Sequence, residues 1–258
     1  MDRDGYGSMT MCGRFTSKTP AADLAGYFGV DEVVAPDLGA RFNVAPTDDA
    51  YAVADSSDRT RRLGTFRWGL VPFWSKDDKG GAKMINARAE GIADKPAFKR
   101  AFERKRCIVP ADGFYEWKRE SSKRKQPWYV TLTSGEPMAF AGLWDSWRPV
   151  KDGDAGPERA SEREAGKLRS CTIITGPPNE KVADLHDRMP VILPREVWDV
   201  WLDPTNHDLA ELQSLLVPLP ADLVVLTPVS TLVNTVTNDG PELIEPVDPD
   251  EGSLFSAR

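Results

Sequence analysis

Apolar residues along this chain recur mostly in short runs of strand length, and helical spacing is confined to a few segments. Alternating or continuous apolar runs predict extended segments near 41–46, 65–71, 107–109, 113–118, 127–133, 138–144, 170–175 and 222–227. Helical spacing predicts helices over 20–28, 94–104, 179–186, 194–202 and 206–216, the second with Asp94 as N-cap and Pro96 in its first turn. Strands and helices do not alternate regularly. The pattern therefore predicts an α+β fold: a single domain with a mainly antiparallel, barrel-like β core flanked by helices.

Composition narrows the class of protein. The 258 residues carry 28% charged side chains and a net charge of −7, which suits one large globular domain. Three cysteines without a CxxC pair predict a reducing compartment and no disulfide framework, and we expect Cys107 and Cys171 to pack in the core. Only His186 and His207 are available as histidine ligands and no metal-binding spacing is present, so we expect neither a metal nor a cofactor.

The ends of the chain and one internal stretch lack strong patterns. Residues 1–10 are polar and do not resemble a secretory signal, and no later run is long enough to cross a membrane, so we predict a cytoplasmic protein. The stretch 148–168 reads as a solvated loop with no assigned role, and 248–258 as an acidic tail. Net negative charge disfavours generic polyanion binding, but six bases and one acid within 95–106 leave a local basic face possible.

The segment Met11-Cys12-Gly13-Arg14 is a candidate reactive site. Removal of everything through Met11 would leave Cys12 with a free thiol and a free α-amine, a pair that condenses with aldehydes to a thiazolidine. Near pH 7.4 about a quarter of α-amines are neutral, against about one lysine in a thousand. The alternative is an ordinary strand start with the Cys12 sulfur in the core.

Two further segments carry candidate acid–base groups. Glu116 stands among aromatics in Phe-Tyr-Glu-Trp, where apolar neighbours would raise a carboxyl pKa and suit a general acid; a surface strand would simply point it to water. His186 precedes an aspartate and an arginine, a setting that fits proton transfer near neutral pH, although a lone histidine is often structural.

Candidate ligand-contacting residues occur in two other segments. If the segment Ile-Asn-Ala-Arg-Ala-Glu is extended, its alternation places Asn86, Arg88 and Glu90 on one face. There an amide can orient a ligand and a guanidinium can clamp a phosphate. The alternative is an ordinary surface strand with a salt bridge. In the aromatic stretch at 67–74, residues such as Trp68 and Trp74 either supply a platform for unpaired bases or belong to the core.

Seven segments in this order together resemble the SOS response-associated peptidase (SRAP) family, also called abasic-site processing proteins. They are Met-Cys-Gly-Arg-Phe at 11–15, Arg-Phe-Asn-Val-Ala-Pro at 41–46, Arg-Trp-Gly-Leu-Val-Pro at 67–72, Ile-Asn-Ala-Arg-Ala-Glu at 85–90, Gly-Phe-Tyr-Glu-Trp at 113–117, His-Asp-Arg-Met-Pro at 186–190 and Gly-Pro-Glu-Leu-Ile-Glu-Pro-Val at 240–247. The resemblance spans residues 11–247, which defines the expected domain.

The resemblance implies a sensor of abasic sites in single-stranded DNA, active in the DNA damage response. It joins its N-terminal cysteine to the ring-opened sugar as a thiazolidine crosslink, with associated autoproteolytic and AP-lyase activity. Carried over by motif, the catalytic residues would be Cys12, Asn86, Glu116 and His186. The DNA-binding residues would be Arg14, Phe73, Trp74, Arg88 and Arg188. We expect a monomer that is nucleoid-associated when acting on DNA.

The chain departs from the family in one respect, because ten residues precede Met11. Either translation begins at Met11, which we favour, or a leader is cut between Met11 and Cys12. Two other functions remain open. An N-terminal-nucleophile peptidase or amidohydrolase would use the same cysteine, with its amine as base. A non-catalytic single-strand binder would need the aromatics and arginines but no thiol.

Overall fold

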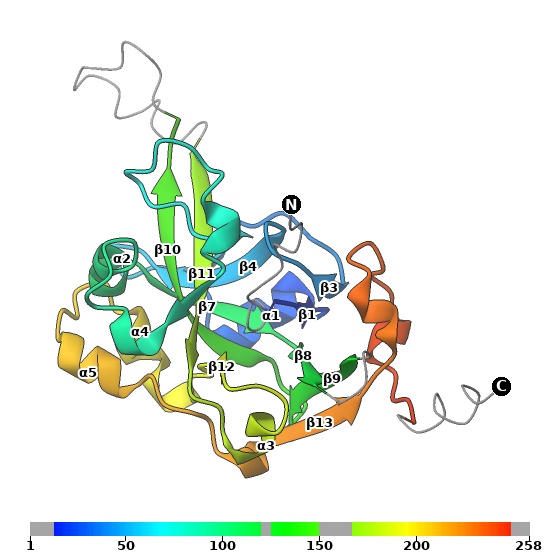
Figure 1. The fold of residues 1–258 in the computed structure, drawn as a ribbon. Helices are drawn as coiled ribbons and strands as arrows, with labels where there is room; N and C mark the ends of the chain where they lie inside the picture. Colours follow the sequence, from blue (N-terminus) through cyan, green and yellow to red (C-terminus); the bar gives the residue numbers. More distant parts are fainter. Residues whose placement is uncertain (1–12, 120–124, 150–166, 249–258) are drawn as a thin grey trace, which may run out of the picture.

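Two β-sheets form the centre of the molecule. The computed structural model describes residues 13–119, 125–149 and 167–248 (Figure 1). The smaller sheet has the order β13 (Val224–Pro228), β9 (Lys125–Leu132), β8 (Gly113–Arg119), β1 (Phe15–Ser17), β3 (Arg41–Val44). The larger sheet has the order β12 (Met189–Pro190), β11 (Leu168–Gly176), β10 (Met138–Trp147), β7 (Arg106–Ala111), β4 (Asp49–Asp55), β5 (Arg61–Trp68), β2 (Glu32–Val33), with β6 (Asn86–Arg88) beside β11.

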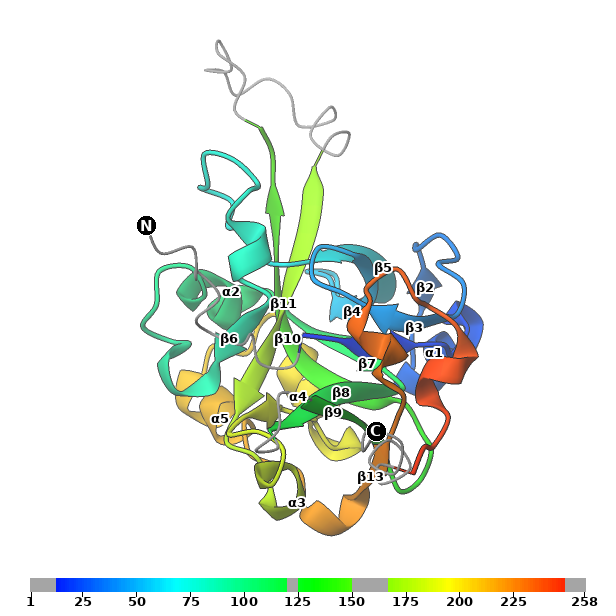
Figure 2. The same ribbon diagram turned by 45° about the vertical axis from the view of Figure 1, so that its right-hand side comes forward.

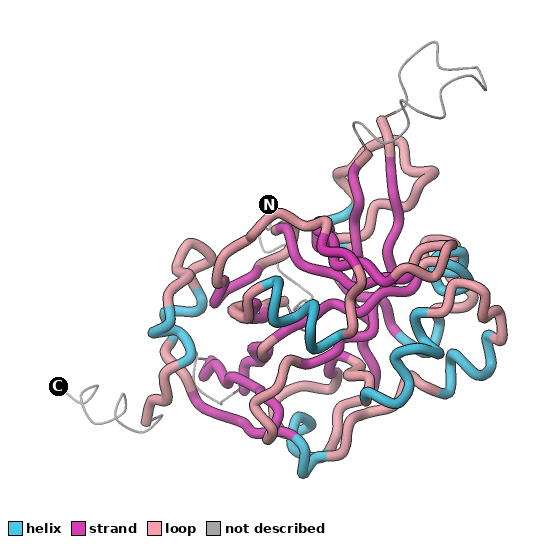
Figure 3. Tube along the Cα trace, turned by 180° about the vertical axis from the view of Figure 1, so that it is seen from behind, coloured by secondary structure: helices cyan, strands magenta, loops and turns pink. Residues whose placement is uncertain are grey.

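Five α-helices within the described residues lie around these sheets, as the view from behind shows (Figure 3). They are α1 (Ala21–Phe28), α2 (Lys99–Arg104), α3 (Glu180–Ala183), α4 (Trp198–Leu202) and α5 (Leu209–Ser214). Most strand pairs are antiparallel, and β11 pairs in parallel with β5 and β6. The predicted α+β class with a mainly antiparallel core is confirmed.

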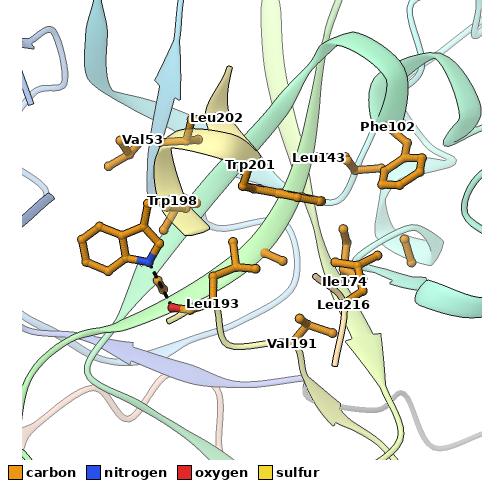
Figure 4. Close-up of a cluster of buried hydrophobic side chains, with 14 of the residues drawn as sticks. Val53, Phe102, Leu143, Ile174, Val191, Leu193, Trp198, Trp201, Leu202 and Leu216 are labelled. Carbon is orange, nitrogen blue, oxygen red and sulfur yellow. Dashed lines mark hydrogen bonds between the residues drawn. The ribbon is translucent and has the colours of Figure 1, made fainter. Parts of the chain in front are cut away.

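Two apolar clusters fill the interior. The first lies between the large sheet and the helices and contains Trp198 and Trp201 of α4; the Trp198 Nε1–H donates to the Leu193 carbonyl over 3.0 Å (Figure 4). The second contains residues of both sheets, including Phe15 and Phe114, and we call it the inter-sheet cluster. Cys107 and Cys171 belong to this second cluster and are fully buried, which confirms their predicted core role.

Burial also accounts for the chemistry of these two thiols. It raises the pKa of Cys171 to about 12 and that of Cys107 well above its ordinary value. Neither sulfur is a thiolate near neutral pH, so neither is a nucleophile.

Several predicted elements have wrong boundaries. The helices predicted over 179–186 and 206–216 are shorter, at Glu180–Ala183 and Leu209–Ser214, and two other elements show a physical cause. The strand predicted over 65–71 begins at Arg61 and ends at Trp68, because Gly69 has φ +132° and turns the chain; a Cβ there would lie 2.7 Å from the Gly81 carbonyl oxygen. The helix predicted over 94–104 begins only at Lys99, with Phe98 rather than Asp94 at the N-cap. A residue before proline is disfavoured in helical geometry, so Pro96 delays the regular helix and 94–98 form turns.

Arg106 joins the ends of two helices. Its guanidinium donates to carbonyl oxygens of Phe102 and Glu103 in α2 and of Trp201 in α4, with further bonds to Asp203 and Asn206 beyond α4. Burial lowers its pKa to about 10, so it stays charged at neutral pH. Helix carbonyls that have no partner within the helix are thereby satisfied by one cation.

A glycine in β8 tests this packing. A Cβ on Gly113 would lie 2.6 Å from both the Tyr129 ring and the Val130 carbonyl oxygen, so we expect Gly113→Ala to lower the free energy of unfolding by about 1–3 kcal/mol. Gly26 in α1 has open space at the same position, and Gly26→Ala should raise stability by about 0.5–1 kcal/mol. Chemical denaturation measures both. Equal stability of Gly113→Ala and the parent protein would contradict the register of β8 against β9.

Candidate active site

One end of β11 places two of the predicted site segments side by side. In β6, Asn86 pairs with Ile173 and Arg88 pairs with Thr175. Thr175 also pairs with Pro190 of β12. One strand residue can pair with two partners only across its two edges, so β6 and β12 flank β11. The segments 85–90 and 186–190, about a hundred residues apart in sequence, therefore meet here.

The pairing also fixes the direction of the side chains in β6. Paired residues in neighbouring strands point to the same face of a sheet, and Ile173 belongs to the inter-sheet cluster. Asn86 and Arg88 therefore point toward the smaller sheet. Ala87 pairs with Ile174, and both belong to the cluster under the helices. The Oδ1 atom of Asn86 is buried, whereas Arg88 is exposed.

Glu116 approaches from the opposite sheet. It lies two residues beyond Phe114 in β8, so both side chains share the face that carries the inter-sheet cluster. Glu116 is 3% exposed and pairs with Trp128 of β9. The surface-strand alternative is therefore wrong. A carboxyl group shielded from water is set between the two sheets.

The first described residues run alongside Glu116. β1 pairs with β8 at Phe15 and Phe114, and the Tyr115 N–H donates to the Arg14 carbonyl over 3.1 Å, which extends the ladder by one residue. The same register sets Gly13 opposite Glu116. Cys12, the predicted nucleophile, is the next residue and lies outside the described part of the chain.

Arg14 is held by the protein itself. Its Nη1 donates to Asn43 Oδ1 over 2.8 Å and to the Val233 carbonyl over 3.0 Å. Asn43 is fully buried, and its Nδ2 donates in turn to three carbonyls of residues 233–238. Partial burial lowers the pKa of Arg14 without making it neutral at pH 7. This network fixes the backbone just after Cys12.

His186 follows the short helix α3, whose start is capped by Asn179. The Asn179 Oδ1 accepts from the Val182 N–H, and its Nδ2 donates to the Leu219 carbonyl. The His186 Nδ1 atom lies 3.2 Å from the Arg188 backbone nitrogen and 2.9 Å from Asp187 Oδ1. A neutral ring can accept from Arg188, and a protonated ring can donate to Asp187. Both protonation states therefore have a partner at Nδ1.

Arg188 binds Glu90 through both of its terminal nitrogens, and its Nη2 also donates to the Thr175 carbonyl over 2.7 Å. The Arg188 bond lowers the pKa of Glu90. Two buried polar atoms beside this pair, Arg188 Nε and Thr175 Oγ1, have no hydrogen-bond partner within the described residues. Buried polar groups are normally satisfied, so such atoms mark a place where a ligand can bind.

The aromatic stretch at 67–74 divides into core and surface. Trp68 is fully buried, whereas Phe73 is 46% and Trp74 56% exposed. The Phe73 N–H donates to Asp145 over 2.8 Å, which anchors the loop to β10, and the Arg100 guanidinium lies 4.1 Å from the centre of the Phe73 ring. Trp68 therefore follows the core alternative, while Phe73 and Trp74 remain available for stacking.

Sequence reasoning missed three partners. The sequence patterns give no role to Asn43, Thr175 or Arg100, although Arg100 belongs to the basic run and Asn43 to the 41–46 segment. The pattern places Glu90 on the face of Asn86 and Arg88, but its bond to Arg188 depends on the pairing of β6 and β12 with one strand. Thr175 gives no signal in sequence.

The described ranges contain neither a metal-binding cluster nor a membrane-spanning helix. No group of three or more histidine, cysteine, aspartate or glutamate side chains there is arranged to hold a metal ion. No helix in the same ranges combines the length and apolar character needed to cross a membrane.

Comparisons with known proteins identify the family of this chain. The model of the family described as "SOS response associated peptidase (SRAP)" matches residues 11–236. Abasic site processing protein YoqW of Bacillus subtilis (strain 168) is 44% identical over 236 residues, which cover 91% of this chain and 99% of that protein. Abasic site processing protein HMCES of Gallus gallus is 34% identical over 76% of this chain and 60% of its own length.

A solved structure shows the same fold. A crystal structure of a protein from Bacteroides thetaiotaomicron superposes with a TM-score of 0.75, at 26% identity, over 92% of this chain and all of that one. The family model, the relatives and the fold converge on the same assignment. The chain belongs to the SOS response associated peptidase (SRAP) family.

Proposed function

We propose that this protein processes abasic sites in single-stranded DNA by forming a covalent thiazolidine crosslink through Cys12, once Cys12 is the first residue. The observation that carries the proposal is the register of β1 on β8, which sets Gly13 opposite the buried Glu116. The relatives named as abasic site processing proteins support the substrate. Autoproteolytic removal of residues 1–11 and AP-lyase activity are part of the same proposal.

The reaction needs an acid and a proton shuttle. An abasic sugar is mostly a closed hemiacetal. As the bond between C1′ and the ring oxygen breaks, Glu116 donates a proton to that oxygen and the C1′ hydroxyl loses its proton to water, which leaves the aldehyde. The Cys12 amine then attacks the aldehyde carbon, and loss of one water leaves a Schiff base. Addition of the Cys12 sulfur to the same carbon closes the thiazolidine, with no net oxidation or reduction. His186 moves protons during Schiff-base formation.

The lyase reaction branches from the Schiff base. Removal of a proton from the carbon next to it expels the 3′ phosphate by β-elimination. His186 suits this transfer because its Nδ1 atom has a partner in either protonation state. Asn86 supplies an amide that holds the sugar or the new N-terminus from the opposite sheet.

Phosphate contacts fall to Arg14, Arg88 and Arg188. Arg88 is exposed, whereas Arg188 must share its guanidinium between Glu90 and a phosphate. Phe73 and Trp74 stack against bases beside the lesion, an interaction worth about 1–3 kcal/mol per base that requires unpaired bases. If about four phosphates are engaged around the lesion itself, these contacts alone contribute a log–log salt slope of roughly −3 to the encounter affinity.

The nucleophile is tested with protein that begins at Cys12, verified by intact mass. Mixed with abasic single-stranded DNA, it should form a heat-stable adduct on a denaturing gel, and Cys12→Ala should form none because the sulfur that traps the Schiff base is gone. Cys171→Ala is the matched control and should crosslink normally, since that thiol is buried. Equal crosslinking by Cys12→Ala would remove Cys12 as the nucleophile, and binding without crosslinking by the parent protein would favour a non-catalytic binder.

The acid–base roles are tested by Glu116→Gln and His186→Ala. We expect Glu116→Gln to slow crosslinking about 10²–10⁴-fold while reversible binding of intact single-stranded DNA stays within about twofold. His186→Ala should depress Schiff-base trapping by borohydride and strand cleavage together. His207→Ala removes the other, exposed histidine and is the matched control, which should leave the adduct yield unchanged. Parent-like rates in both variants would exclude the two residues from the mechanism.

A peptidase function would use the same site, with the protein's own residues 1–11 as its substrate. If the Cys12 thiol attacks the Met11 carbonyl carbon, the bond to the Cys12 nitrogen breaks and leaves a free α-amine and a thioester. Water then hydrolyses the thioester, so residues 1–11 are released once and no other peptide is needed. A chain that starts at Met1 should then lose those residues in purified form, without added protease.

A further inference from the structure

The basic run at 95–106 divides into structural and surface cations. Arg106 is 3% exposed and binds five carbonyl oxygens, and Lys105 binds Asp145 over 2.5 Å. Lys95, Lys99, Arg100 and Arg104 are exposed, and within the described ranges none of the four forms an ion pair with a carboxylate. We call these four residues the α2 cations.

The α2 cations are continuous with the exposed aromatic loop. Arg100 stacks on Phe73 at 4.1 Å, and Asp145 binds both the Phe73 N–H and the Lys105 ammonium group just after α2. One carboxylate therefore fixes the aromatic loop against the C-terminal end of α2. Figure 2 shows α2, β6 and the segment that precedes β6 on one side of the molecule.

Unpaired cations beside exposed aromatics have a specific chemical use. Phosphates of a single strand attract the cations, and its bases stack on the aromatics, so the combination follows an unpaired nucleic acid strand. Three of these cations are in the six-residue helix α2 and Lys95 lies four residues before it. The protein carries a net charge of −7, so this local excess of positive charge runs against the charge of the whole molecule. An internal scaffold role does not explain them either, since Ala101 and Phe102 supply the buried face of α2.

We propose that the α2 cations bind the phosphate backbone of the single-stranded DNA flank that leaves the abasic site past Phe73 and Trp74. This inference rests on the proposed function and extends it, because it gives the site a minimum substrate length. In this arrangement the abasic site reacts between the two sheets, and Phe73 and Trp74 stack on the adjoining bases. The α2 cations then bind the next phosphates, on one side of the lesion only. Arg100 covers Phe73 in the free protein and is positioned to exchange that ring for a phosphate.

The test neutralises three of the cations in Lys99→Gln/Arg100→Gln/Arg104→Gln. Fluorescence anisotropy with an intact 15-nucleotide strand should show a salt slope smaller by about 2, at about 0.7 per lost phosphate contact, and affinity at 0.1 M salt about 10- to 100-fold weaker. A trinucleotide centred on an abasic site should crosslink at the parent rate. Extending it on one flank should speed the parent protein and not the variant.

The matched control is Lys18→Gln/Arg59→Gln/Arg62→Gln, which removes the same charge from cations that are already paired with carboxylates. It should keep the parent salt slope. Arg100→Lys/Arg104→Lys keeps the charge and should also keep the slope. A triple α2 variant with the parent slope, or a control with the same loss, would overturn the inference.

The outcomes separate this inference from the proposed function. If the parent protein crosslinks and the α2 variant keeps the parent salt slope, the inference about the α2 cations is contradicted and the proposed function is not. If the parent protein crosslinks no abasic strand but the variant has a reduced salt slope, the proposed crosslinking is contradicted. The α2 cations would then still be a binding surface for single-stranded DNA.

Discussion

The site depends on one strand, β11, which pairs with β10 and β12 along one edge and with β5 and β6 along the other. A strand paired on both edges cannot slip, because a shift of one residue would turn every side chain to the other face. This pairing holds Asn86 on the face of Ile173 and brings Arg188 to Glu90. β8 faces it across the inter-sheet cluster and presents Glu116. The arrangement of the candidate site is thus a consequence of two sheets in fixed register.

The inter-sheet cluster explains why the Glu116 carboxyl group is shielded from water. Phe15, Phe114 and Trp68 are fully buried in this cluster, and Glu116 lies on the same face of β8 as Phe114. Arg14 and Asn43 then hold the backbone that leads to Cys12 through bonds to residues 233–238. The C-terminal part of the domain therefore positions the N-terminal part, which is why motifs at both ends of the chain belong to one site.

Much of the fold follows from the sequence, because the strands after residue 106 are apolar runs of ordinary length bounded by turns. The boundaries that failed depend on contacts between distant residues. Gly69 ends β5 because it meets Gly81, and Pro96 shifts the start of α2. The candidate residues Asn86, Glu116 and His186 are identifiable by motif, but sequence cannot show that Glu116 is buried or that Glu90 engages Arg188. The burial of a side chain and its partners on other strands depend on how distant strands pair, and a local sequence pattern does not contain this information.

The proposed chemistry requires that Cys12 supplies both atoms that bond to the DNA sugar. Tandem mass spectrometry of the digested adduct between the protein and abasic single-stranded DNA tests this most directly. We expect one modified peptide, which begins at Cys12 and carries the sugar with the loss of one water. A nucleotide attached to any other residue, or a peptide that still contains Met11, would contradict it.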